Sequence, residues 1–191
     1  MIDPFATFAA WFAEAGASEP NDANAFALAT ATPEGRPSVR VVLCKAWDAR
    51  GFVFYSNLDS RKGRELAANP FVHMDFHWKT QRRQVRVDGR AEPVTGDEAD
   101  AYFASRPRDS QAGAWASLQS QALPDRATFE ARLGDVRARF EGQDVPRPPR
   151  WSGWRIVPEK IEFWQDRDNR LHERLVFTRS GDGWTTGLLY P

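Results

Sequence analysis

Between residues 25 and 93 the sequence alternates between short apolar runs and turn-forming residues, and this alternation is the strongest constraint on the fold. The runs FALATAT, SVRVVLCKAW and FVFYSN are separated by the turn sequences PEGRP and DARG. Two further runs, FVHMDFHW and RRQVRVDGRAEPV, follow a short polar segment. Runs of this kind, bounded by Gly, Pro and Asp, are typical of antiparallel strands joined by tight turns. The spacing predicts that the first three runs form an antiparallel meander.

Helical segments flank these strands and are marked by their end signals. Residues 3–16 begin with an Asp-Pro pair and carry apolar residues at helical spacing, which predicts an amphipathic helix. Ser60 is expected to cap a short helix over SRKGREL, and Thr95 forms a capping box with Glu98 at the start of another helix. A last helix is predicted over about 125–141.

The order of these elements predicts the fold class. Three more strands, WRIVPEKIEFWQD, RLHERLVFTR and GWTTGLL, follow the last helix. About seven strands with short turns and few helices predict a β-barrel with helices packed outside it. Regular helices do not separate the strands, which argues against a doubly wound parallel sheet. A chain of 191 residues is expected to form a single domain over 1–191.

The charge and cysteine content argue against several classes of function. Lys plus Arg and Asp plus Glu each number 26, and this zero net charge does not suit a nucleic-acid coat or a polybasic membrane binder. Cys44 is the only cysteine, so an intrachain disulfide and a cysteine metal cage are excluded, and the three histidines do not resemble a metal motif. No apolar stretch approaches the ~18 residues of a membrane span, and the N-terminus does not read as a signal peptide. We expect a reduced, cytoplasmic protein without a metal site.

The segment SRKGREL places two cations where a helix disfavours them. Arg61 and Lys62 fall in the first turn of the predicted helix, at the positive end of its dipole. An anion such as a phosphate at that helix end would explain both charges. The alternative is a solvated helix start with loosely placed charges.

The segment RLHER groups three cationic or titratable side chains. If it is a strand, Arg170, His172 and Arg174 project from one face, because alternate residues of a strand share a face. Such a face suits an anionic ligand, and the alternative is a solvated strand surface.

The segment AYFASRPRDSQ carries donors that suit a phosphate monoester. Tyr102 and Arg106 are four residues apart and share a helix face, and Ser110 follows the break at Pro107. The alternative is an ordinary helix with a surface arginine.

The strand SVRVVLCKAW carries two further cations, Arg40 and Lys45. They are five residues apart, so a regular strand sends them to opposite faces. Both can touch one ligand only if the strand bulges or if Lys45 reaches round from the strand end, and the sequence leaves this open.

Common signatures of other site chemistries are missing. No GxGxxG opens a helix after a strand, and the chain carries neither a P-loop nor a GxSxG elbow. The residues therefore indicate a barrel whose Arg, Lys, Tyr and Ser side chains could hold phosphate-bearing small molecules.

Taken together, these segments resemble the pyridoxamine 5′-phosphate oxidase family. The matching stretches keep the family's order over most of the chain: RVVLCK, FYSN, SRKGREL, RRQVRVDGRAE, YFASRPRDSQAGAW, QS, WSGWRIVPEKIEFWQ and RLHER. The resemblance implies a mainly β fold with α, a split β-barrel (the FMN-binding split barrel) with flanking helices. It also implies a homodimer with FMN in two sites at the subunit interface.

The resemblance further implies which residues act. The cofactor FMN would be bound by Arg40, Val41, Val42, Leu43, Cys44, Lys45, Tyr55, Ser56, Arg61, Lys62, Gln84, Gln119, Ser120, Trp164 and Arg174. The substrate would be held by Lys45, Tyr102, Arg106, Ser110, Arg170 and His172. Of these, Arg170 and His172 are the expected catalytic residues, which orient the substrate over the flavin, and the identity of any catalytic base stays open.

The implied reaction oxidises pyridoxine 5′-phosphate or pyridoxamine 5′-phosphate with O2 to pyridoxal 5′-phosphate, releasing hydrogen peroxide and, from the amine, ammonia. The nearest alternative is a related flavin oxidase of phenazine biosynthesis, which would be expected to lack the RPRDS cluster. The other is a module that binds FMN or pyridoxal phosphate without turnover, against which the RLHER motif counts. The expected partners are the substrate, O2 and a second copy of the chain, without nucleic acid or membrane.

Overall fold

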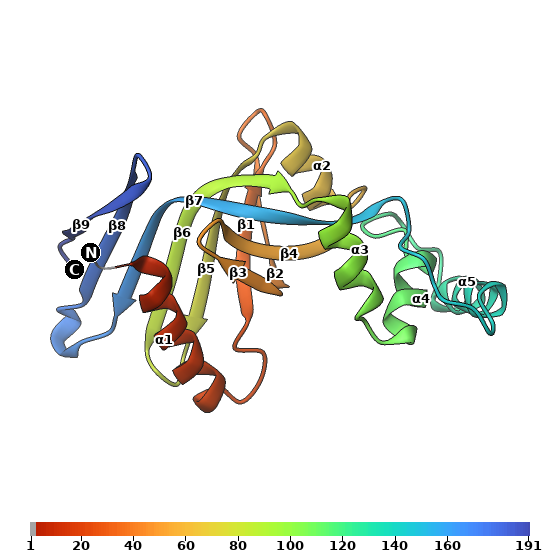
Figure 1. Cartoon of the computed structure of the whole chain (residues 1–191), viewed down its shortest axis with the longest axis horizontal. Coiled ribbons are helices and arrows are strands. Elements are labelled where there is room, and N and C mark those ends of the chain that lie inside the picture. Colours follow the sequence, from red (N-terminus) through yellow and green to blue (C-terminus); the bar gives the residue numbers. More distant parts are fainter. Residues whose placement is uncertain (1–2) are drawn as a thin grey trace.

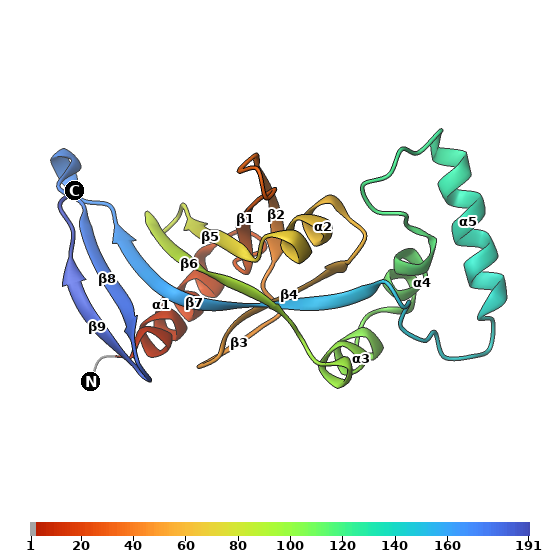
Figure 2. The ribbon, with the colours of Figure 1, turned by 90° about the horizontal axis from the view of Figure 1, so that it is seen from above.

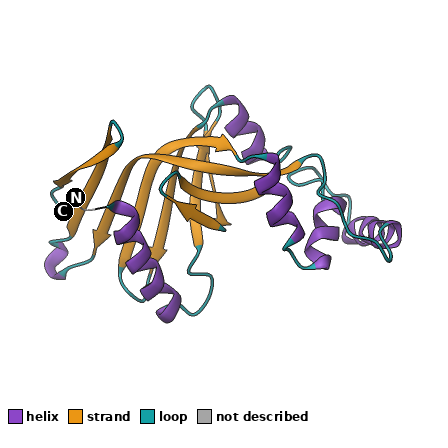
Figure 3. Ribbon diagram, viewed as in Figure 1, coloured by secondary structure: helices purple, strands orange, loops and turns teal. Residues whose placement is uncertain are grey.

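A curled antiparallel sheet forms the centre of the computed structural model, which describes residues 3–191 (Figure 1). The strands are β1 (Ala25–Ala31), β2 (Pro37–Leu43), β3 (Ala46–Asp48), β4 (Gly51–Asn57), β5 (Phe71–Trp78), β6 (Arg83–Pro93), β7 (Trp151–Gln165), β8 (Glu173–Ser180) and β9 (Gly183–Leu188). The helices are α1 (Pro4–Ser18), α2 (Arg61–Ala68), α3 (Gly96–Ala104), α4 (Arg108–Ala116) and α5 (Arg126–Arg139), with a short 3-10 helix, η1 (Asp168–Arg170). Figure 3 shows that the helices lie around the sheet and not between its strands.

The chain passes from one end of the sheet to the other at a sharp turn between β2 and β3. The strand order is β2-β1-β5-β6-β7-β4-β3, with β8 and β9 added beyond β7. The chain leaves β2 at Leu43 and enters β3 at Ala46, and the Lys45 amide donates to the Val53 carbonyl at 2.8 Å. The predicted barrel with helices outside it is confirmed as an open, curled sheet of the split-barrel kind.

The predicted meander of the first three runs is wrong in its third strand. Strands β1 and β2 form the expected antiparallel pair. Strand β4, however, pairs with β3 and β7 and not with β2, so that Phe52 lies opposite Ile156. The reason is that the run SVRVVLCKAW is two strands, and the turn at Cys44 and Lys45 carries the chain to the other end of the sheet.

Aromatic side chains hold α1 against the curled sheet. Asp3 accepts a hydrogen bond from the Phe5 amide at 3.0 Å and so caps this helix as expected. Phe8 is fully buried, with its ring 4.9 Å from Phe52 and 5.2 Å from Phe76. Burial of each such ring contributes about 1.5–3 kcal/mol, so this cluster stabilises the packing of α1 on the sheet.

Strand β7 is the longest described strand and connects the two ends of the molecule. Its first half pairs with β4 and its second half with β8, while β6 runs along its other edge. Seen from above, β7 runs from the α3–α5 end to the β8–β9 end (Figure 2). Among the described residues, no helix has both the length and the apolar character needed to cross a bilayer.

Two local predictions need correction. The segment RLHER is not one strand: Asn169 and Arg170 have positive φ angles of 55° and 63°, and β8 begins only at Glu173. Arg170 and His172 therefore do not share a strand face with Arg174. The sequence analysis also does not predict the helix α4, because it places Pro107 only at the end of the preceding helix. The same proline stands at the N-cap of α4, a place where a missing N–H costs nothing.

Candidate functional site

Most of the predicted site residues line one cavity of about 680 Å³, which we call the cationic cavity. It lies between β2, β4, α2 and the C-terminal end of α3. The predicted residues that line it are Arg40, Val41, Val42, Leu43, Lys45, Tyr55, Ser56, Arg61, Lys62, Tyr102, Arg106, Gln119 and Ser120. Lys45 lies beyond the end of β2, and this is how it shares a cavity with Arg40.

The cavity has a strong excess of positive charge. Five cationic side chains line it, and no Asp or Glu of the described chain is among its lining residues. Like charges confined in this way repel one another unless an anion binds between them. The cavity is therefore suited to an anionic ligand.

Lys62 is the most deeply placed of these cations. It is only 8% exposed, and burial, together with nearby Arg40, lowers the pKa of Lys62 to about 8. Its Nζ donates to the hydroxyl oxygens of Ser56 at 2.9 Å and Ser60 at 3.3 Å. The Ser56 hydroxyl in turn donates to Gln119 Oε1 at 3.2 Å. Among residues 3–191, Lys62 thus has no carboxylate partner, and a bound phosphate would supply the missing negative charge.

The first turn of α2 lies at the same cavity, which Arg61 and Lys62 line. Ser60 caps this helix by accepting from the Gly63 amide at 3.3 Å, as the sequence predicted. Arg61 and Lys62 are the first two residues of the helix, where the dipole favours an anion.

One carboxylate stands behind the cavity, and the sequence analysis missed it. Glu65 is 6% exposed and accepts hydrogen bonds from Arg40, Arg61, Thr30 and Ser38. Burial alone would raise the pKa of Glu65, but these hydrogen bonds outweigh burial and bring its pKa to about 2. The signal available in the sequence was the four-residue spacing from Arg61, which places the two side chains together on a helix.

An aromatic wall forms another side of the cavity. The rings of Tyr55 and Tyr102 stack at 4.0 Å, and Trp151 stacks on Tyr55 at 5.4 Å. The Arg106 guanidinium lies 4.8 Å from the Trp151 ring, and its Nη1 is buried without a hydrogen-bond partner in the described chain. Burial lowers the pKa of Arg106. A buried, unpartnered guanidinium nitrogen next to a cavity indicates that a ligand completes its hydrogen bonds.

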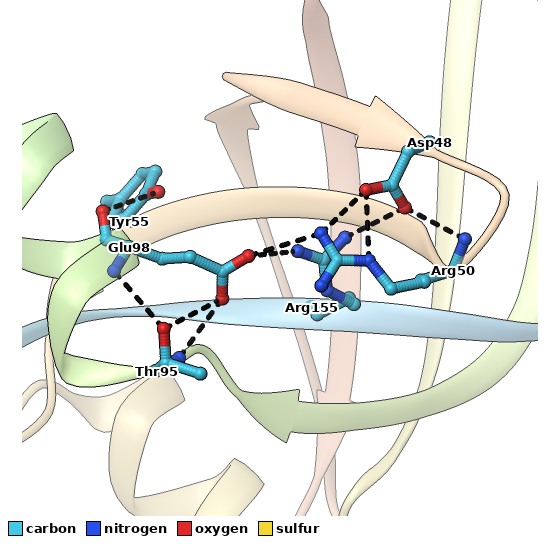
Figure 4. A network of polar contacts seen from close by, with 6 residues as sticks. All are labelled: Asp48, Arg50, Tyr55, Thr95, Glu98 and Arg155. Carbon is cyan, nitrogen blue, oxygen red and sulfur yellow. Dashed lines mark hydrogen bonds and ion pairs between the residues drawn. The ribbon is translucent and has the colours of Figure 1, made fainter.

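A closed ionic network fixes the helix that carries Tyr102 (Figure 4). Glu98 caps α3 with Thr95 as predicted, and its Oε1 accepts from Arg155 at 2.8 Å and from Arg50 at 3.3 Å. Arg155 also donates to Asp48 at 3.2 Å. The Tyr55 hydroxyl donates to the Glu98 carbonyl at 3.4 Å, so this network and the aromatic wall share a support.

The remaining predicted residues mostly line a second cavity, of about 620 Å³, beside η1 and the end of β7. These residues are Gln84, Trp164, Arg170 and His172. The His172 ring lies 4.6 Å from Trp164, and its Nδ1 is 2.9 Å from Asp166 Oδ1. The same Nδ1 accepts a hydrogen bond from the Arg167 amide at 3.3 Å, and the sequence analysis singled out neither Asp166 nor Arg167.

Three predicted residues of the described chain line neither cavity. Cys44 is buried with its thiol against the Ala46 carbonyl, and burial raises the pKa of that thiol to about 12. Ser110 lies on α4. Arg174 makes a two-pronged ion pair with Glu162, at 2.7 Å and 3.1 Å, and shares this carboxylate with Arg86.

Two family models match the chain. The model described as "Pyridoxamine 5'-phosphate oxidase" matches residues 12–140, and the model described as "Pyridoxine 5'-phosphate oxidase C-terminal dimerisation region" matches residues 151–191. The first of these covers more than half of the chain.

Curated relatives match nearly the whole chain. A protein of Sphingopyxis alaskensis named pyridoxine/pyridoxamine 5′-phosphate oxidase is 68% identical, with 99% of this chain and 88% of the relative covered. A protein of the same name from Gluconobacter oxydans is 61% identical, with 99% and 94% covered.

Solved structures show the same fold. PhzG from Burkholderia lata, solved in complex with tetrahydrophenazine-1-carboxylic acid, superimposes with a TM-score of 0.93 at 36% identity, covering 99% of this chain and 93% of that one. A pyridoxamine 5′-phosphate oxidase-related, FMN-binding protein from Nostoc punctiforme gives a TM-score of 0.80 at 15% identity over the full length of both chains.

Proposed function

The chain belongs to the pyridoxamine 5′-phosphate oxidase family, and we propose that it is an FMN-dependent oxidase that converts pyridoxine 5′-phosphate or pyridoxamine 5′-phosphate to pyridoxal 5′-phosphate. The observation that carries this proposal is the cationic cavity. Both FMN and the substrate bear a phosphate with a charge of roughly −1.5 to −2 at neutral pH, and the cavity offers five cations for them.

The residues of the cavity fit FMN. We assign its phosphate to Arg61 and Lys62 in the first turn of α2 and to Arg40 on the neighbouring strand, because all three line the cavity and no Asp or Glu of the described chain lines it with them. Ser56, Gln119 and Ser120 supply neutral polar groups from the same walls. A bound anion would neutralise the buried Lys62 and accept a hydrogen bond from the unpartnered Arg106 nitrogen.

Tyr102, Arg106 and Lys45 are the proposed phosphate ligands of the substrate. They lie in the same cavity, and Arg106 has the donor available. Ser110, which was expected with them, does not line the cavity, so its role in substrate binding stays a prediction.

The division of the predicted residues between two cavities supports a shared site. We infer that the chain works as a homodimer, in which the second cavity of one protomer completes the cationic cavity of its partner. Gln84 and Trp164 would then contact FMN, and Arg170 and His172 would face the substrate. Arg174 would reach FMN only by adding a contact to its existing pair with Glu162.

When bound, FMN would supply the redox chemistry, the two-electron oxidation of the substrate carbon that bears the alcohol or amine, with O2 reduced to hydrogen peroxide. The protein's own residues bind and orient. Arg40, Arg61 and Lys62 hold one phosphate, and Tyr102 and Arg106 hold the other. His172, whose Nδ1 accepts from the Arg167 amide, and Arg170 would fix the substrate ring relative to the flavin.

Flavin spectroscopy tests the proposal directly. The purified protein is expected to be yellow and to release FMN on denaturation, as chromatography of the released flavin will show. Anaerobic addition of pyridoxamine 5′-phosphate should bleach the flavin, and air should restore its colour. FAD or no flavin would contradict the cofactor, and an FMN spectrum that no pyridoxine derivative bleaches would favour a binding module.

A phenazine-type oxidase is the second candidate, because PhzG has the same fold at 36% identity. Bleaching by a reduced phenazine carboxylic acid but not by pyridoxamine 5′-phosphate would favour it. The single domain over 1–191 and the cytoplasmic location stay predictions, which limited proteolysis and cell fractionation test.

A further inference from the structure

We propose that Glu65 is a positioning residue that holds Arg40 and Arg61 in the orientation in which they bind the FMN phosphate. The inference rests on the proposed function, because it takes the cationic cavity to be the phosphate site. Glu65 does not line the cavity and touches no expected ligand; it acts through the two arginines.

Each oxygen of the Glu65 carboxylate has a separate task. Oε1 accepts from Arg61 Nε at 2.8 Å, on the same helix. Oε2 accepts from Arg40 Nη2 at 3.2 Å, on β2. The carboxylate therefore connects two elements that both line the cavity, and it leaves the other guanidinium nitrogens of Arg61 free for an anion.

The carboxylate is itself held in place before any ligand binds. The hydroxyls of Thr30 and Ser38 donate to Oε2 at 2.5 Å and 2.6 Å, and Thr30 is 3% exposed. Arg40 Nη1 also donates to Thr30 Oγ1 at 2.6 Å. A carboxylate fixed in this way gives the arginines one orientation, which reduces the side-chain entropy lost when a phosphate binds.

This arrangement differs from an ordinary surface ion pair. On α5, Arg126 and Glu130 have the same four-residue spacing, with Nε and Oε1 2.9 Å apart. Both of those side chains are largely exposed, whereas Glu65 is buried although its partner Arg61 is exposed. An exposed pair restrains its arginine weakly. Glu130→Gln is therefore a matched control for Glu65→Gln.

Two opposite effects of Glu65 on FMN binding are distinguished by whether the Kd for FMN rises or falls when Glu65 is replaced. If Glu65 positions the arginines, Glu65→Gln weakens FMN binding, and we expect the Kd to rise about tenfold, the loss of one well-oriented charge-assisted contact. If Glu65 only reduces the positive charge of the cavity, the same variant tightens FMN binding.

The experiment is a titration of flavin-free protein with FMN, followed by quenching of flavin fluorescence, on the wild type, Glu65→Gln, Arg61→Ala, the double variant and Glu130→Gln. We expect Glu65→Gln to raise the Kd and Glu130→Gln to leave it unchanged. When Arg61 is already Ala, Glu65→Gln should raise the Kd by a smaller factor than in the wild type, because only its contact with Arg40 is left to lose. Full additivity in the double variant, an unchanged Kd or a lowered Kd in Glu65→Gln would each overturn the inference.

The Arg61→Ala variant keeps this result separate from the proposed function. If Arg61→Ala weakens FMN binding but Glu65→Gln does not, the phosphate site stands and the positioning role fails. If neither variant changes the Kd, the phosphate site itself is wrong. Should Glu65→Gln fail to fold, Thr30→Val removes one hydroxyl that fixes the carboxylate, and a rise of the Kd by about threefold is expected. An unchanged Kd in Thr30→Val would then contradict the inference.

Discussion

The cationic cavity and the ionic network at the start of α3 are both built from charged side chains, but their charge balance differs. The network joins two arginines, Arg50 and Arg155, to two carboxylates, Asp48 and Glu98, so its charges balance within the chain (Figure 4). The cavity gathers five cations around a space that no carboxylate lines, with Glu65 behind it.

This difference distinguishes charges that stabilise the fold from charges that a bound ligand would neutralise. In the network each arginine meets its carboxylates directly, so its charge stabilises the junction of β3, β7 and α3. In the cavity, Lys62 is buried among neutral hydroxyls, a placement that costs folding free energy. Such a cost is expected where a bound anion offsets it.

The largest expected effect comes from removing a cavity cation. Lys62→Met and, separately, Arg61→Ala are expected to weaken FMN binding by about 10- to 150-fold, because each loses a charge-assisted contact to phosphate worth ~1.5–3 kcal/mol. Flavin-free Lys62→Met should be at least as stable to urea as the flavin-free wild type, since it loses a buried charge. A loss of stability equal with and without FMN would show that these cations are structural.

The second cavity is expected to affect turnover rather than flavin retention. Arg170→Ala and His172→Ala should keep FMN and the wild-type Tm but lower kcat/KM for pyridoxine 5′-phosphate by about 10- to 100-fold, if each contributes ~1.4–2.7 kcal/mol to the transition state. Steady-state kinetics with flavin occupancy measured on the same samples provides the check. Wild-type kcat/KM in both variants would remove the second cavity from the active site.

Arg155→Met is the converse test, on the balanced network. It leaves Glu98 and Asp48 without a buried cation, and we expect a loss of about 1–3 kcal/mol in the free energy of unfolding, less if water reaches the two carboxylates. The FMN Kd of the folded protein should change by less than twofold. A large change in that Kd would contradict the assignment of the network to stability and of the cavity to ligand binding.

The sequence predicts those parts of the fold that depend on interactions between residues close together in the chain. The caps at Asp3, Ser60 and Thr95 are local, and all three form as predicted. Strand pairing is not local: the partner of β4 is β7, about a hundred residues later, and turn spacing carries no information about it.

The same limit applies to the candidate site. The cationic motifs singled out in the sequence, with Arg61, Lys62, Arg106 and Arg40, line one cavity of the structure, while their role in binding stays a prediction. For Arg61 and Lys62 the signal was a charge in an unfavourable local position, which is visible in the sequence. The role of Glu65 was not visible, since three of its four partners come from β1 and β2. The positive φ angles at residues 169 and 170 were equally hidden, because neither residue is a glycine.

The smallest predicted effect is a pH dependence of FMN binding that belongs to the cavity alone. In the flavin-free protein, burial and Arg40 lower the pKa of Lys62 to about 8 from its usual 10.5. A phosphate beside Lys62 raises that pKa again, because it stabilises the charged form. The bound state therefore keeps a proton that the empty cavity loses above pH 8, and by linkage FMN binding must weaken as the pH rises through that value.

The size of the effect follows from the one titration. The arginines of the cavity stay charged, and the FMN phosphate is already fully ionised above its second pKa of about 6. Between pH 7 and pH 9 the Kd should rise about tenfold in the wild type, which fluorescence titration at constant ionic strength can measure. Arg61→Ala should bind more weakly but keep this rise, whereas Lys62→Met should lose it. A rise of the same size in Lys62→Met would show that another group titrates. Lys62 would then have no demonstrated role in anion binding, and the contrast between the cavity and the balanced network would lose its support.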